Sequence, residues 1–92
     1  MKRFRVRMMR FERDKGWHYV AVPAELTKDL LPLADRGLIA VQAEVGGMAW
    51  RTSLLPMGDG THFLALPQKV RQRAGLQLGD WVEVSFATRT RS

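Results

Sequence analysis

The sequence predicts a small, mainly β domain. Its expected fold is a closed barrel of six short strands, made from two internal strand–strand–helix–strand repeats, with two short helices capping its ends. Three observations lead to this prediction. The segment GWHYVAVPAEL at 16–26 returns as GTHFLALPQKV at 60–70. Apolar and polar residues alternate over several short segments, which is typical of strands buried on one face. The chain has 92 residues, enough for one domain with one modest core.

The internal repeat organises the whole chain. Gly16 matches Gly60 and Pro23 matches Pro67, so the two copies lie 44 residues apart. After these prolines the halves drift by a residue or two, and LADRGLIAVQAEV corresponds loosely to GLQLGDWVEVSF. The expected pseudo-repeats are residues 4–45 and 48–87 of a single barrel domain over 1–87. Each half is half a barrel, because neither buries its apolar face without the other.

The first half begins with RFRVRMM at 3–9, whose period of two predicts a half-buried strand. Asp14-Lys15-Gly16 is a turn signal. Residues 17–22 are rich in aromatic and β-branched types and predict a second strand. Pro23 is expected at the first position of a short helix, where its missing N–H has no cost. A third strand is predicted over 38–45, with alternate residues on one apolar face.

The second half follows the same order. Gly46-Gly47 predicts the hairpin that joins the halves, because two glycines suit its positive φ angles. Pro67 is expected to start the second helix and Gly75 to end it in the left-handed conformation. Further strands are predicted over 48–55, 61–66 and 81–87. Residues 88–92 have no core partner in the pattern and are expected to form a basic mobile tail.

The positive charge is concentrated at the two ends of the chain. The net charge is +6 and the sequence pI about 10.8. Residues 1–13 carry a net of +5 and the tail with Arg89 and Arg91 a net of +2, which leaves −1 for the residues between. A clustered basic surface is typical of a protein with a polyanionic partner. The alternative is a solvated strand face followed by a basic tail.

The chain lacks the signals of membrane insertion and secretion. No apolar run approaches the ~20 residues that span a bilayer. The start MKRFRVRMMRF has no continuous apolar region and no small-residue cleavage site, so it does not resemble a secretory signal. There is no cysteine, hence no disulfide framework. These features favour a cytoplasmic protein without membrane contact, and leave the oligomeric state open.

Six arginines are candidates for contact with nucleic acid or another polyanion. Alternation places the first three on one side of the opening strand, and two others lie on the second helix. The second helix is basic where the first is acidic. Arg71 has the alternative of capping carbonyls or pairing with Asp80 or Glu83. The six candidates are Arg3, Arg5, Arg7, Arg51, Arg71 and Arg73.

Trp50, His18 and His62 are candidates for a ligand-binding rim. Trp50 lies beside Arg51, and the pair can meet a flat ligand, although core filling is the alternative for the indole. The histidines occupy equivalent positions of the repeat and can approach each other or line equivalent ends of the barrel. Their alternative is packing at the start of a strand. Zn²⁺ takes three or four ligands, so two histidines do not predict a metal site, and no cofactor is expected.

No constellation of residues predicts catalysis. Asp59 and Asp80 lie beside glycines in turns, where their carboxylates are expected to accept turn amides. Ser53 has no placed base. The segment GDG lacks the length and the Lys-Ser/Thr of a phosphate loop. The protein is therefore not expected to be an enzyme.

Two stretches carry a resemblance to known families. LPQKVRQRAGLQLGDWVEVSF resembles the strand–Pro–helix–Gly-Asp–strand unit of the AbrB and MazE type of DNA-binding regulators and antitoxins, in which two chains share a double-split β-barrel. The whole chain, with WRTSLLPMGDGTHFLALPQKVRQRAGLQLGDWVEV as its core, resembles a prokaryotic family termed domain of unknown function, number nineteen-oh-five. That resemblance implies a single-chain double-split pseudobarrel. It implies no catalytic residues, and some members adjoin a domain linked to bacteriocin protection.

Two functions follow as hypotheses. The first is a non-enzymatic binding module that contacts nucleic acid or another polyanion through a basic face. The second is an accessory module that binds a ligand or a protein partner, linked to stress or bacteriocin and toxin resistance.

Overall fold

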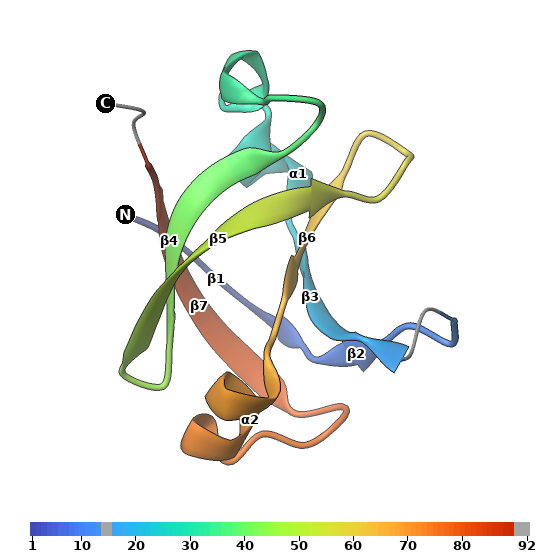
Figure 1. Ribbon diagram of the computed structural model, residues 1–92, viewed down its shortest axis with the longest axis vertical. Coiled ribbons are helices and arrows are strands. Elements are labelled where there is room, and N and C mark those ends of the chain that lie inside the picture. The colour runs from blue at the N-terminus through green and yellow to red at the C-terminus, as the bar shows by residue number, and fades with distance from the viewer. Residues whose placement is uncertain (14–15, 90–92) are drawn as a thin grey trace.

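A single barrel-like sheet forms most of the molecule (Figure 1). The computed structural model describes residues 1–13 and 16–89. In these residues the strands are β1 (Lys2–Arg7), β2 (Met9–Arg10), β3 (His18–Val22), β4 (Ile39–Val45), β5 (Met48–Pro56), β6 (His62–Ala65) and β7 (Trp81–Thr88). The helices are α1 (Ala24–Thr27) and α2 (Gln68–Ala74), with a short 3-10 helix η2 (Leu31–Leu33). The predicted mainly β class is confirmed.

The order of the strands makes the sheet nearly close on itself. Hydrogen-bonded neighbours follow the order β1-β7-β4-β5-β6-β3-β2, and all the pairs are antiparallel. The two ends of this order, β1 and β2, are consecutive pieces of chain separated by Met8. The row of strands therefore returns to its starting point, which leaves few free edges.

The described residues form seven strands, where the sequence predicts six. The predicted strand over 3–9 is interrupted at Met8, whose N–H donates to Asp80 O at 2.8 Å and whose carbonyl accepts from Gly79 N at 3.0 Å. The backbone there pairs with the turn before β7. β1 pairs with β7, whereas β2 pairs with β3. Met8 itself is buried and keeps the apolar period, so the alternation does not reveal the break.

The hairpin and the second helix end as predicted. Gly46 and Gly47 have φ angles of 58° and 81° between β4 and β5, which pair from Val45 and Met48 onward. Gly75 follows α2 in the left-handed conformation with φ 65°. The prolines differ from the prediction by one position. Pro23 and Pro67 have extended ψ angles of 133° and 155°, so each is the residue before its helix, not the first one in it.

The two helices lie at opposite ends of the barrel (Figure 1). α1 has one turn, and Lys2 joins it to β1. The ammonium of Lys2 donates to Leu26 O at 2.8 Å and pairs with the Asp29 carboxylate at 2.7 Å. This hydrogen bond holds the pKa of Asp29 below its usual range. One of the basic residues near the N-terminus is thus already paired within the fold.

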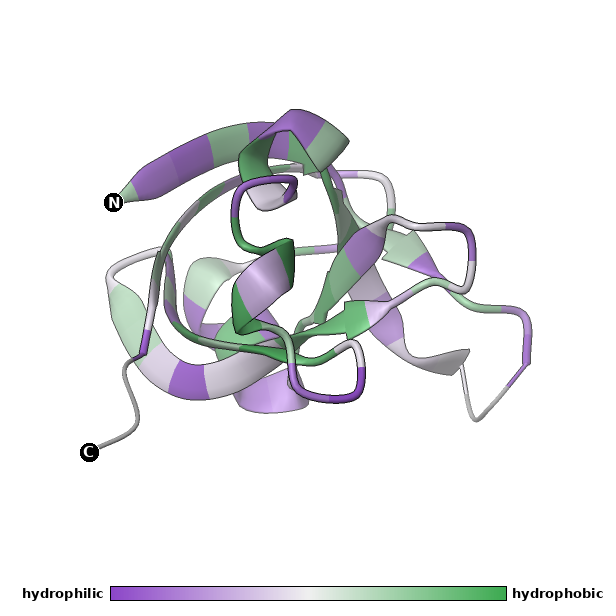
Figure 2. Cartoon of the chain, turned by 90° about the horizontal axis from the view of Figure 1, so that it is seen from above, coloured by the Kyte–Doolittle hydropathy of each residue, from purple (hydrophilic) through white to green (hydrophobic). Residues whose placement is uncertain are grey.

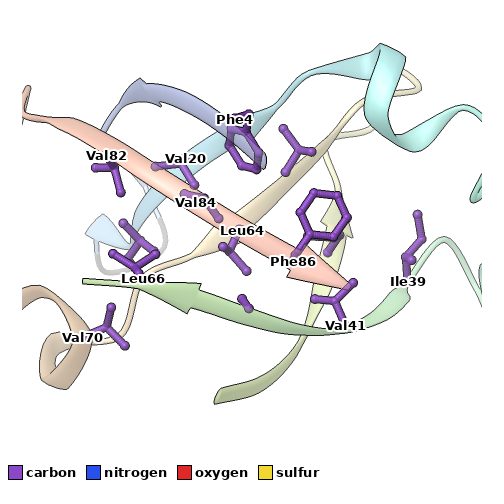
Figure 3. Packing of buried hydrophobic residues seen from close by; sticks show 14 of the residues in the cluster. Phe4, Val20, Ile39, Val41, Leu64, Leu66, Val70, Val82, Val84 and Phe86 are labelled. Atoms are coloured by element: carbon purple, nitrogen blue, oxygen red, sulfur yellow. The ribbon is translucent and has the colours of Figure 1, made fainter. Parts of the chain in front are cut away.

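Alternate residues of the strands form one hydrophobic core. Side chains from β1, β3, β4, β6, β7 and α2 point into the same cluster in Figure 3. The rings of Phe4 and Phe86 meet edge to face at a centroid distance of 6.1 Å. Figure 2 shows hydrophilic and hydrophobic segments alternating along the strand that starts at the N-terminus. The predicted apolar faces are confirmed for β4 (Ile39, Val41, Ala43, Val45) and β7 (Val82, Val84, Phe86).

The chain remains ordered past the predicted end of the barrel at residue 87. Thr88 is the last residue of β7. Arg89 N donates to Ala40 O at 2.9 Å, and the Arg89 guanidinium donates to Val41 O and Thr52 O, both at 2.9 Å. These two residues belong to the barrel and not to a mobile tail. The rest of that predicted tail, 90–92, and the first two residues of the predicted 14–16 turn lie outside the described residues.

In the described part of the chain, no helix has the length and apolar character needed to cross a membrane.

Candidate nucleic-acid interface

The outer face of β1 combines three arginines with an exposed tryptophan of β7. Arg3, Arg5 and Arg7 are exposed and lie opposite Ser85, Glu83 and Trp81. The indole of Trp81 is 49 % exposed. The guanidinium carbons of Arg5 and Arg7 are each 4.8 Å from the centre of this ring, within the range of a cation–π contact. We refer to Arg3, Arg5, Arg7 and Trp81 as the Arg–Trp face.

Two carboxylates limit how far the positive charge extends across the sheet. Glu83 on β7 lies directly opposite Arg5. Glu44 on β4 lies opposite Ser85, one strand further. Both glutamates are exposed. The basic surface is therefore confined to β1 and its border with the start of β7, where Arg7 also donates to Gly79 O at 3.3 Å.

Arg51 does not join the Arg–Trp face. It is exposed on β5, opposite Gln42. The strands β7 and β4 lie between β5 and β1. Three strand spacings of about 4.8 Å put the two strands ~14 Å apart along the sheet. Of the six candidate arginines, only the three on β1 therefore share one strand face.

The two arginines of α2 differ in environment. Arg73 is exposed. Arg71 is half-buried, and its Nε donates to Leu66 O at 3.1 Å, which ties the helix to the end of β6. This contact matches the predicted alternative in which Arg71 caps a carbonyl. Asp80, a partner considered for Arg71, accepts a hydrogen bond from Gln77 N at 2.8 Å instead.

The matching histidines occupy opposite ends of the β3–β6 ladder. His62 lies opposite Val22, and Leu66 N donates to His18 O at the other end. The two levels of the ladder are four residues apart along β3, which is ~13 Å at about 3.3 Å per residue. The histidines therefore do not approach each other. The described residues hold no group of three or more His, Cys, Asp or Glu that can bind a metal ion.

His62 lies inside the fold and not on a rim. Its side chain is 4 % exposed, and its Nε2 is 2.9 Å from Gly37 O. A carbonyl only accepts, so Nε2 carries the proton in this contact. Nδ1 is buried and has no partner among the described residues. His62 holds the turn before β4, whereas His18 is half-buried beside a surface groove.

Trp50 also faces inward. It lies opposite the buried Ala43 and packs against the core. Consecutive residues of a strand point to opposite sides, so Trp50 and Arg51 cannot meet one flat ligand. Trp81 is an aromatic residue that lies beside two arginines, and the sequence patterns did not point to it as a site residue. Trp81 lies outside the alternating apolar series of β7, and this could have indicated from the sequence that its ring is exposed. Its arginine neighbours could not be predicted in this way, because they depend on the pairing of β7 with β1.

The acidic turn residues have the predicted local partners. The Asp59 carboxylate accepts from Thr61 N at 3.0 Å and from the Thr61 hydroxyl at 2.5 Å. These hydrogen bonds hold the pKa of Asp59 below its usual value. With Asp80 bonded to Gln77, both aspartates stabilise turns, as the sequence predicts.

The fold and this face define the class of the molecule: a small, mainly β protein with a nearly closed, barrel-like sheet and arginines along one outer strand. The chain belongs to the family described as "Domain of unknown function (DUF1905)", whose model matches residues 4–86. A comparison with curated proteins gave no match. The family predicted from the sequence is confirmed.

Proposed function

We propose that this protein is a non-enzymatic binding module that contacts nucleic acid, or another polyanion, through the Arg–Trp face. The observation that carries the proposal is the placement of Arg5 and Arg7 over the exposed ring of Trp81. Arginine side chains contact phosphates, and exposed aromatic rings stack on bases. Side-by-side groups of both kinds suit a strand of nucleic acid better than an anion without bases.

The partners of the titratable groups support a role without catalysis. Asp59 and Asp80 accept hydrogen bonds from turn residues, and His62 is bonded to a loop carbonyl. A general acid or base needs a free position facing a substrate. These side chains instead maintain the backbone around them.

We further propose that the barrel is a double-split barrel of the AbrB and MazE type, made by duplication within one chain. The strand pairs support this proposal. In the repeat, β1 and β2 together correspond to β5, β3 corresponds to β6, and β4 corresponds to β7. Equivalent strands pair with each other in β3–β6 and β4–β7, the β1–β7 pair is equivalent to β5–β4, and the β2–β3 pair is equivalent to β5–β6. In the β3–β6 ladder Val20 lies opposite Leu64, its own counterpart at the repeat offset of 44. Likeness to DNA-binding regulators adds weight to the proposed partner, although fold alone does not determine function.

Fluorescence anisotropy with labelled single-stranded and duplex oligonucleotides tests the proposed function. Binding should be strongest at low salt, with log K falling linearly against log salt concentration, because phosphate contacts release counterions. Arg5→Gln and Arg7→Gln should each lower the magnitude of the slope by about 1. Trp81→Ala should weaken single-strand binding by about 1–3 kcal/mol, the contribution of one stacked base.

Arg51→Gln is the matched control, because it removes an exposed arginine from the same sheet away from the Arg–Trp face. It should leave the slope unchanged. An absence of binding at the lowest salt, or an equal loss for Arg51→Gln and Arg5→Gln, would contradict the proposed interface.

A second candidate is an accessory module that binds a ligand or protein partner, with the link to stress or bacteriocin resistance suggested above. A groove of about 810 Å³ between η2, β4 and β7 favours it, because Leu33 and Leu38 are exposed there beside Arg89. Co-purification of the native chain and of a Leu33→Asp variant, followed by mass spectrometry, tests this function. If the native protein and the Leu33→Asp variant retain a partner equally, or if neither retains one, the groove is not the binding site.

A further inference from the structure

A second groove lies apart from the Arg–Trp face, between the start of β3 and α2. Its lining includes Trp17, His18, Leu66, Pro67 and Arg71, and its volume is about 370 Å³. This is near the lower limit of ligand sites, which span roughly 300–1,000 Å³. We refer to it as the β3–α2 groove. Trp17 is 52 % exposed, so one wall offers an accessible aromatic ring.

Arg71 is held in the wall of this groove by one of its donors. Its Nε is used by Leu66 O at 3.1 Å. A guanidinium has five N–H donors, and this bond uses one of them. No other hydrogen bond or ion pair joins the Arg71 side chain to the rest of the described chain. Arg71 also lines a further groove of about 330 Å³, which runs along α2 and the residues just after it. Its remaining donors therefore border open space.

Arg10 brings a second guanidinium close to Gly16, which lines the groove. It lies directly opposite His18 in the β2–β3 pair, so both side chains leave the same side of the ribbon. The Arg10 Nε is 2.6 Å from where a Cβ on Gly16 would stand. Gly16 also lines the groove, so the absence of a side chain there makes room for Arg10.

The positive charge of this cluster has no acidic partner within the part of the chain that the structure describes. No ion pair or hydrogen bond joins a carboxylate to Arg10, His18 or Arg71 there. Burial lowers the pKa of His18, and the charges of Arg71 and Arg10 lower it further. Two cations thus act on the His18 ring, and no carboxylate among residues 1–13 and 16–89 is paired with them.

We propose that the β3–α2 groove binds a phosphate monoester attached to a flat ring, as in a nucleoside monophosphate. The phosphate meets Arg71, Arg10 and His18, and the ring lies against Trp17. Arginine suits this ligand because its planar fork matches two phosphate oxygens. A monoester carries about −1.5 to −2 charges at neutral pH. It therefore neutralises two cations more fully than the single negative charge of a backbone phosphodiester does. The site uses none of the residues of the Arg–Trp face, so the two proposals can fail separately.

Titration of the ¹⁵N-labelled protein with adenosine 5′-monophosphate, adenosine and inorganic phosphate tests the site. The monophosphate should shift the amides of 16–18 and 65–71 and should bind at least tenfold more tightly than either part alone. Its binding should also raise the pKa of His18, which a purely structural role for Arg71 would not explain. Equal binding of adenosine and its monophosphate, or shifts confined to the Arg–Trp face, would overturn the proposal.

Matched variants assign the phosphate contact. Arg71→Gln should weaken binding of the monophosphate at least tenfold, whereas Arg73→Gln, on the same helix and exposed, should leave it unchanged. Because Arg71→Gln also removes the bond to Leu66 O, Arg10→Gln provides a second test without that bond. Unchanged affinity in both Arg71→Gln and Arg10→Gln would contradict the assignment.

Competition with oligonucleotides distinguishes two sources of this chemistry. If a 5′-phosphorylated strand displaces the monophosphate and the same strand with a 5′-hydroxyl does not, the groove takes strand ends. If neither displaces it, the groove takes free nucleotides. Both outcomes support a monoester site. Equal displacement by the two strands would show that the terminal phosphate is not recognised.

Discussion

Arg71 combines a structural contact with an electrostatic effect. Its Nε bonds to the Leu66 carbonyl, and its charge acts on His18 across the β3–α2 groove. Burial, Arg71 and Arg10 all disfavour the protonated imidazole, so the pKa of His18 lies below its usual value of about 6.5. His18 is then neutral in the fold at neutral pH. The contribution of His18 to the free energy of unfolding is therefore fully present above the unfolded-state pKa. It is lost as the pH falls through the lowered pKa of the folded state.

Replacing one of these arginines should therefore raise the pKa of His18. We expect Arg71→Gln and Arg10→Gln each to move the titration of the His18 ring protons, followed by NMR, to higher pH. Arg73→Gln is the control and should leave the titration unchanged. A His18 titration that is the same in all four proteins would mean that burial alone accounts for the low pKa.

At the scale of elements, the hairpin between β4 and β5 is packed against the end of α2. A Cβ on Gly46 would stand 2.8 Å from the Cβ of Ala74, whereas a Cβ on Gly47 would meet nothing within 4 Å. Both glycines have positive φ angles. The two positions therefore share the backbone requirement and differ in the contact with the helix.

The pair predicts unequal losses of stability. Gly47→Ala should lower the free energy of unfolding by about 1–2 kcal/mol, the cost of a left-handed residue with a side chain. Gly46→Ala should lose a further ~1–3 kcal/mol from overpacking against Ala74. Urea denaturation measures both. In an Ala74→Gly background the extra loss at Gly46 should largely disappear, and equal losses at both glycines in the native background would refute the contact.

Local patterns predicted most of the elements well. The apolar faces of β4 and β7, the two-glycine hairpin and the glycine after α2 are all present. Each of these depends on neighbouring residues and on backbone preferences. The break at Met8 was not predictable in this way, because Met8 continues the apolar period and bonds to a turn more than seventy residues away in sequence.

For the whole molecule, the β3–β6 ladder joins the two halves through the core. Val20 and Leu64 lie opposite each other in this ladder, and both are fully buried (Figure 3). The pairs β4–β7, β1–β7 and β4–β5 also join the halves. Since these junctions are lined by the same core, the halves should unfold together.

Leu64→Ala tests this cooperativity. It should lower the free energy of unfolding by about 2–5 kcal/mol, the loss for a leucine removed from a packed core. Tryptophan fluorescence and far-UV circular dichroism should give coincident urea transitions in the native chain and in the variant. Leu33→Ala, at a position 62 % exposed, should change stability by less than about 0.5 kcal/mol. Separate transitions for the two probes would show that the halves are independent.

By itself, the sequence determined the mainly β class, the family, the core faces and the presence of three arginines on one side of β1. These properties follow from alternation, turn residues and the internal repeat, which act over short stretches or through direct similarity. The tertiary structure alone decided that Trp81 lies beneath Arg5 and Arg7, that Arg51 lies three strands away from β1, and that His18 and His62 are separated. These placements depend on strand order and register. Both are set by pairing between distant segments around one shared core. They therefore cannot be predicted from the residues that adjoin a position in the sequence.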